Sequence, residues 1–177
     1  MTHIRPLTPT DLASVTTIYA HHVLHGTGTF ETEPPSEDAM SQRWADVQSK
    51  GLPWLVLEQD DQVMGFAYAN WFKPRPAYRF SAEDSIYLHP NAAGQGHGRA
   101  LLQALLAELE AMGVRQVLAV IGDSANGGSI GVHRSMGFEH TGILKASGWK
   151  FGQWLDVVLM QKSLGQGAST PPEESIA

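Results

Sequence analysis

The sequence predicts a single α/β domain built on a mixed, mostly antiparallel β-sheet flanked by helices. Short apolar or alternating segments, typical of strands, recur along the chain and are separated by segments with helical spacing of apolar residues. The early strands follow one another through a tight turn, which predicts an antiparallel hairpin. The later strands are separated by a long helix, which predicts one parallel β-α-β crossover.

The first half of the chain is expected to begin with a strand and two helices. Thr8, Pro9 and Asp11 form a helix start of the capping-box type, and this helix ends at Gly26. A second helix follows Pro34-Pro35-Ser36 and runs to about Lys50. Three strands come next, at 54–58, 63–71 and 85–88. A loop with two prolines, 73–78, precedes the third strand.

The second half alternates helices and strands. Helical spacing of leucines predicts a helix over 98–112, and 126–136 predicts a shorter one, with a buried strand at 117–121 between them. Two further strands begin at Phe138 and Trp154. The residues that follow are rich in Gly, Ser, Pro and Glu, so we expect one domain over 1–163 and a disordered tail over 164–177.

Composition narrows the possible functions. The net charge is -6 and the 12 Lys and Arg residues form no stripe, which argues against a nucleic-acid partner. Cysteine is absent, so thiolate chemistry and a thiolate zinc site are excluded. No apolar segment resembles a signal peptide or is long enough to span a bilayer. We therefore expect a cytoplasmic protein with no membrane partner.

The segment Gly94-Gln95-Gly96-His97-Gly98-Arg99 lies between a predicted strand and a predicted helix. Glycines let a backbone come close to a phosphate, and the free N–H groups of a helix start bind anions. A P-loop would require Lys-Ser/Thr after its last glycine, and a dinucleotide fingerprint would require G-x-G-x-x-G. Neither pattern is present. A tight turn that only packs the helix against the sheet remains an alternative at this point.

This loop resembles the R/Q-x-x-G-x-G/A segment of the GNAT acetyltransferases, with Gly96 and Gly98 as its glycines and Ala93 in place of the usual Arg or Gln. Three further segments resemble the phosphinothricin and methionine sulfoximine acetyltransferase branch of that family: 82–90, 126–138 and 149–156. The resemblance implies the GNAT fold, with two central strands splayed apart, and acetyl-CoA as cosubstrate. It also implies a homodimer. The aromatic stretch 149–154 could form the interface of that dimer or, equally, part of the core of the domain.

The resemblance also implies which residues hold acetyl-CoA. The backbone of Ile86-Tyr87-Leu88 would pair with the pantetheine arm like an added strand, although an ordinary core strand remains possible. The glycine loop would hold the pyrophosphate. The polar contacts would come from one helix, through Asn126, Ser129 and His133, although Asn126 could instead cap that helix.

Acetylation of an amine needs a base, because only about one lysine-like amine in a few thousand is neutral near pH 7. By resemblance to the branch, Glu83 is the candidate base, and Asp84 is the alternative carboxylate. His133 stands where most GNAT enzymes have a tyrosine, and it could donate a proton to the departing CoA thiolate. A solvated Glu83 and a merely packed His133 are the structural alternatives.

The substrate is expected to be the amine of a small zwitterionic amino-acid analogue. Cations in the segment 73–83 could bind its acid group, and Arg does so through a bidentate fork. An acetyltransferase for protein N-termini or lysines, and a non-catalytic acyl-CoA-binding module, are the alternatives. The candidate substrate residues are Phe30, Phe72, Lys73, Arg75, Tyr78, Arg79, Glu83, Asp84 and Ser85, with Trp71 as a further apolar wall.

A metal site is not expected. His21, His22 and His25 cluster on one predicted helix, but no H-E-x-x-H pattern and no third ligand accompany them.

Overall fold

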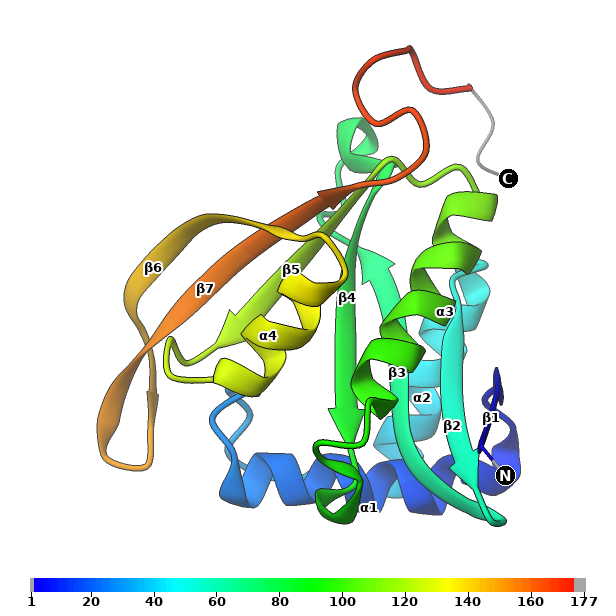
Figure 1. The fold of residues 1–177 in the computed structure, drawn as a ribbon. Coiled ribbons are helices and arrows are strands. Elements are labelled where there is room, and N and C mark those ends of the chain that lie inside the picture. The colour runs from blue at the N-terminus through cyan, green and yellow to red at the C-terminus, as the bar shows by residue number, and fades with distance from the viewer. Residues whose placement is uncertain (1, 174–177) are drawn as a thin grey trace.

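The computed structural model describes residues 2–173, and in this part of the chain one sheet of seven strands has the order β1-β2-β3-β4-β5-β7-β6 (Figure 1). Neighbouring strands are antiparallel, except for the parallel pair β4–β5. The mixed, mostly antiparallel sheet is thus confirmed. The strands are β1 (Thr2–Pro6), β2 (Trp54–Gln59), β3 (Gln62–Trp71), β4 (Ser81–Leu88), β5 (Gln116–Gly122), β6 (Glu139–Lys150) and β7 (Gln153–Ser163).

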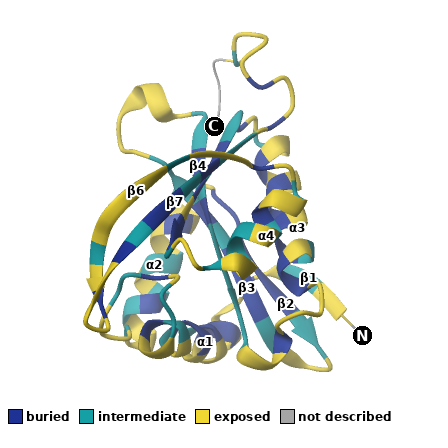
Figure 2. Cartoon of the chain, turned by 60° about the vertical axis from the view of Figure 1, so that its left-hand side comes forward, coloured by how far each residue is buried: buried dark blue, intermediate teal, exposed yellow. Residues whose placement is uncertain are grey.

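Helices cover both faces of this sheet (Figures 1 and 2). Successive side chains of β4 point to opposite faces. Tyr87 packs edge-on against Tyr19 of the first helix, with ring centroids 4.9 Å apart, whereas Leu88 lies beside Gly98 of the third. One face therefore carries α1 (Leu12–His25) and α2 (Glu37–Ser49), and the other carries α3 (His97–Ala111) and α4 (Gly127–Ser135).

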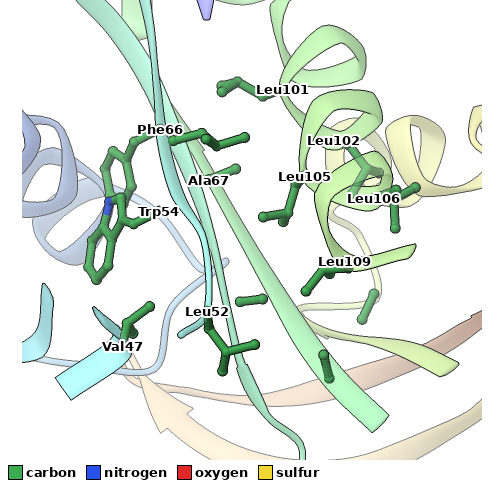
Figure 3. Packing of buried hydrophobic residues seen from close by; sticks show 14 of the residues in the cluster. Val47, Leu52, Trp54, Phe66, Ala67, Leu101, Leu102, Leu105, Leu106 and Leu109 are labelled. Carbon is green, nitrogen blue, oxygen red and sulfur yellow. The ribbon is translucent and has the colours of Figure 1, made fainter. Parts of the chain in front are cut away.

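The core is densest between α3 and strands β2 and β3. Figure 3 shows the leucines of α3 on one side of the sheet, with Trp54 and Val47 on the other. Shortening one such leucine to alanine would cost about 2–5 kcal/mol, because a cavity would remain. The α3 leucines buried here are Leu101, Leu102, Leu105, Leu106 and Leu109.

The predicted start of the first helix is confirmed. The Asp11 carboxylate accepts hydrogen bonds from the Thr8 amide and hydroxyl, each at 2.8 Å, and Arg5 binds the same carboxylate. Residues Pro9–Asp11 form a 3-10 turn, and α1 follows directly. The predicted strand start at Ser85 was wrong: β4 begins at Ser81, because Ser81–Asp84 pair with β5 on one side and 82–84 pair with β3 on the other.

The chain after β7 contains turns but no helix or strand over 164–173. Leu164 is nonetheless buried, and Arg115 donates hydrogen bonds to the carbonyls of Gly167 and Pro171. The domain limit at 163 and the disordered tail stay predictions, and residues 174–177 of that tail lie outside the described residues. Over residues 2–173, no helix combines the length and apolarity needed to cross a bilayer.

Candidate active site

A cleft opens where β4 and β5 separate. The two strands pair only from Ser81 with Gln116 to Asp84 with Ala119. Beyond that point β4 stays with β3, while β5 stays with β7 as far as Gly122. The resulting cavity of about 450 Å³ is lined by both strands, by the start of α3 and by α4. The splayed central strands expected from the resemblance are therefore present.

One edge of β4 faces this cleft over Ser85–Leu88, and these four residues line it. The carbonyl of Leu88 accepts a hydrogen bond of 2.8 Å from His22 Nε2. Burial lowers the pKa of His22, and the bond to Leu88 opposes that effect only in part. His22 therefore occupies one of the backbone groups predicted for the pantetheine arm, a pairing over 66 residues of sequence that no local pattern announces.

The glycine loop places an uncapped helix start at the end of the cleft. Gly94 and Gly96 have φ of 75° and 82°, a left-handed conformation that favours glycine. Gly96 is the N-cap of α3 and offers no side chain to the amides of the first turn. Gly98 is buried, with Val132 3.4 Å from where its Cβ would lie. Such a helix start fits a phosphate group.

The side chains of this loop point in different directions. The ring of His97 is buried against β2, where its Nε2 lies 3.0 Å from Gln59 Oε1. Gln95 donates to the carbonyl of Asn91. Arg99 is exposed. Of the cofactor residues predicted in this loop, Gln95 and His97 would therefore contact a phosphate through their backbone. Arg99 would contact it through its guanidinium as well.

The start of α4 closes the cleft on the other side. Asn126 Oδ1 accepts the Ser129 amide at 3.2 Å, and its Nδ2 donates to the Gly122 carbonyl, so the capping role of Asn126 is confirmed. Asn126, Ser129 and His133 all line the cleft, as the resemblance implied.

His133 and Asp84 form a buried pair in the cleft wall. Nε2 of His133 lies 2.8 Å from Asp84 Oδ2, and Nδ1 lies 2.7 Å from the Ser129 carbonyl oxygen. The side chains are only 5% and 1% exposed. Burial lowers the pKa of His133, but the hydrogen bond and charge of Asp84, together with the bond to the Ser129 carbonyl, more than offset it, so the net shift is upward. The Asp84 contact is a pairing that the sequence did not reveal.

Glu83 lies next to Asp84 but points to the α1–α2 face, because side chains alternate along the strand. Burial raises its pKa, the neighbouring Asp84 raises it further, and Lys73 opposes both. Ser85 points the same way and hydrogen-bonds Tyr68. A carboxylate with a raised pKa is suited to accept a proton near neutral pH.

The loop between α1 and α2 forms a wall of the site on the α1–α2 face. Phe30 packs on two glycines of the sheet: an added Cβ would lie 2.9 Å from its ring at Gly122 and 2.3 Å from it at Gly148. The buried Lys150 donates 2.8 Å hydrogen bonds to the carbonyls of Gly26 and Thr29. Lys150 was not predicted to act near the site. It holds the loop whose Gly26 lines the cleft, and it stands out as a cation within the aromatic stretch 149–154.

The predicted substrate cations are not gathered around Glu83. Lys73, Arg75 and Arg79 are exposed. Arg79 donates to the Pro76 carbonyl, and its guanidinium lies 4.7 Å from the Phe80 ring centroid. Of these three cations, only Lys73 affects the pKa of Glu83. The aromatic candidates Phe72 and Tyr78 pack edge-on with centroids 5.6 Å apart, and Trp71 packs against the core.

The three histidines of α1 lie side by side but do not point to a common centre. The His21 ring centroid is 4.9 Å from that of His25 and 5.7 Å from that of His22, and Nε2 of His22 instead bonds the Leu88 carbonyl of β4. Among residues 2–173, no group of three or more His, Asp or Glu side chains has an arrangement that could hold a metal ion. The expectation of no metal stays a prediction.

A cleft between splayed strands, with a phosphate-binding helix start and a carboxylate beside it, defines an acyltransferase that uses an acyl-CoA. Residues 17–138 match the model of the Acetyltransferase (GNAT) family. The chain belongs to this family and is an acetyltransferase.

Individual relatives resemble almost the whole chain. Phosphinothricin N-acetyltransferase of Alcaligenes faecalis is 49% identical over 96% of this chain and 86% of its own length. The L-methionine sulfoximine/L-methionine sulfone acetyltransferase of Pseudomonas paraeruginosa is 37% identical over 95% and 98%. The crystal structure of a phosphinothricin acetyltransferase from Sinorhizobium meliloti in complex with AcCoA has a TM-score of 0.95 and 45% identity, covering 98% of this chain and 94% of the other.

Proposed function

We propose that this protein transfers the acetyl group of acetyl-CoA to the primary amine of a small amino-acid analogue of the phosphinothricin or methionine sulfoximine type. The observation that carries the proposal is the position of Glu83. Its desolvated carboxylate is carried by β4 on the α1–α2 face, one residue before the cleft-lining Asp84 where β4 and β5 part, so an amine that approaches from that face would meet a base at the gap between the strands. The relatives named above act on such compounds.

The cleft residues divide the binding of acetyl-CoA among them. The amides of the first turn of α3, with Arg99, would hold the pyrophosphate. The open edge of Ser85–Leu88 would bind the pantetheine amides. Asn126 and Ser129 would supply polar contacts from α4. Acetyl-CoA supplies an activated thioester in this position.

Glu83 performs the proton transfer. The carboxylate takes a proton from the amine nitrogen, whose lone pair forms the new C–N bond as the C–S bond breaks. The bonding pair leaves with sulfur. The thiolate takes one proton from solvent and Glu83 returns its proton to solvent, so an amine and a thioester become an amide and a thiol. A base placed this way contributes about 10²–10⁴-fold to such a reaction.

The proposal extends to a homodimer. Trp149, Phe151 and Trp154 are 57%, 55% and 64% exposed at the end of the β6–β7 hairpin, with Leu144 half exposed nearby. A cluster of large apolar side chains on a surface marks an interaction site. Sedimentation of the protein against Trp154→Glu would test this: a dimer that dissociates in the variant supports it, and a monomeric protein contradicts it.

The test of the activity is a panel of amines. CoA release from acetyl-CoA would be followed with phosphinothricin, methionine sulfoximine, methionine sulfone, ordinary amino acids and peptides with free N-termini or lysines. We expect turnover with the amino-acid analogues and little with peptides. Preferential turnover of peptides would support the protein-acetylating alternative, and acetyl-CoA binding without turnover of any amine would support a non-catalytic module.

A further inference from the structure

The buried pair of Asp84 and His133 implies a fixed protonation state. The Ser129 carbonyl can only accept a hydrogen bond, so Nδ1 of His133, 2.7 Å away, must carry a proton. Asp84 Oδ2 lies 2.8 Å from the other ring nitrogen, and a carboxylate also only accepts. With Asp84 ionised, both ring nitrogens are donors and the ring is an imidazolium.

We propose that Asp84 is a positioning residue that holds His133 as an imidazolium in the wall of the cleft, where the ring acts as a fixed positive charge rather than as a proton shuttle. This rests on the proposed function, because the charge would face the sulfur of a bound thioester. The alternative from sequence, that His133 donates its proton to the thiolate, requires one of two short hydrogen bonds to break.

The surroundings of His133 favour this assignment. Phe138 packs edge-on against the ring, with centroids 5.0 Å apart, and shields it from water. Asp84 Oδ1 is buried and has no hydrogen-bond partner among the described residues, so no second donor shares the charge of the carboxylate. A preorganised charge in a water-excluded wall stabilises developing negative charge without reorganisation during the reaction.

The other charged groups near the pair do not replace Asp84. On its own helix, the neighbouring Arg134 is exposed. On β4, Glu83 points to the opposite face. Within residues 2–173, Asp84 is the only charged group that shifts the pKa of His133. Removal of that one charge should therefore release the proton of His133.

The experiment compares the protein with Asp84→Asn, which keeps the shape and the hydrogen-bond acceptor but removes the charge. NMR titration of the His133 ring is the first readout and needs no turnover. We expect the ring to titrate above the usual range of histidine in the unaltered protein and at clearly lower pH in the variant. Glu110→Gln, which removes an exposed carboxylate at the end of α3, should leave the ring unchanged.

The pH profile of kcat is the second readout. Glu83 must be deprotonated and His133 protonated, so activity rises through the pKa of Glu83 and falls through that of His133. Loss of the Asp84 charge lowers both pKa values, and both limbs should move to lower pH. We expect kcat of the variant to fall about 10-fold or more near pH 8 and much less near pH 6.

The outcomes separate cleanly. Asp84→Glu should keep the charged ring if the carboxylate is what matters, and should Asp84→Asn not fold, the titration of the ring in the unaltered protein decides the proposal. A His133 ring that titrates at or below the usual range of histidine in the unaltered protein, or one whose titration Asp84→Asn leaves in place, overturns the proposal. Absence of turnover with every amine would refute the proposed function and leave the NMR result standing.

Discussion

On the cleft face of β4, the groups that would hold acetyl-CoA come from short continuous segments. Gly94–Arg99 and Asn126–His133 each form a strand-to-helix or loop-to-helix junction whose backbone geometry is local. On the α1–α2 face, the wall of the proposed acceptor site depends on contacts between distant segments: Lys150 bonds the carbonyl of Gly26, 124 residues earlier in the chain.

The difference explains how far the sequence could go. A phosphate-binding helix start needs glycines at fixed spacing, and that spacing is visible in the chain. The acceptor wall depends on where a loop comes to rest against strands from the other end of the sequence. Local spacing cannot show such a contact. The structure therefore brings the predicted substrate residues together less than the predicted cofactor residues.

The largest expected effect is on the base. Glu83→Gln keeps the size of the side chain but cannot accept the proton, so kcat should fall about 10²–10⁴-fold. The KM for acetyl-CoA should hardly change, because the cofactor cleft is left intact. Steady-state kinetics with both substrates varied would measure this, with Glu110→Gln as the control for loss of a carboxylate. A kcat that stays within about 3-fold would remove Glu83 from the mechanism and shift attention to Asp84.

Lys150 tests whether the acceptor wall depends on one long-range contact. Lys150→Met leaves the Gly26 and Thr29 carbonyls without their donor, and each unsatisfied buried group costs about 1–3 kcal/mol. Urea unfolding should show that loss, and the KM for the amine should rise more than that for acetyl-CoA. Lys145→Met, at a side chain 73% exposed and paired with Asp156, should cost about 1 kcal/mol or less. Equal losses for the two lysines would contradict the role of Lys150.

The glycines beneath Phe30 test the shape of that wall. In Gly122→Ala the new Cβ would lie 2.5 Å from the Thr27 carbonyl oxygen, so the loop must move. We expect a loss of about 1–3 kcal/mol in the free energy of unfolding and a higher KM for the amine. Gly142→Ala is the matched control, since nothing lies within 4 Å of its added Cβ. A neutral Gly122→Ala would mean that the loop is not seated on β5.

Particular residues show which parts of the site the sequence could predict. Asn126 carries both a cap signature and a family resemblance, and the structure confirms the cap. The sequence indicated Asp84 as the alternative base. It did not reveal the partner that defines the environment of Asp84, because His133 is 49 residues away. The start of β4 was also missed, because polar residues such as Glu83 and Asp84 lack the apolar run that marks a strand. Pairing with β3 and β5 overrides that local preference.

The smallest expected effect distinguishes Lys73 from Arg79, for which the sequence predicts the same role. Lys73 lowers the pKa of Glu83, so Lys73→Ala should raise that pKa and move the acid limb of the kcat profile to higher pH. Activity would then fall on the acidic side and stay nearly unchanged above neutrality, where Glu83 is deprotonated in both proteins. Arg79→Ala should leave the acid limb in place, because its guanidinium lies over Phe80 and does not act on Glu83. The shift of the acid limb is expected to be small, since Lys73 is exposed and its charge is screened. A shift of the acid limb in Arg79→Ala but not in Lys73→Ala would place the cation of the acceptor site at Arg79, and would mean that the loop 73–80 rearranges when the amine binds.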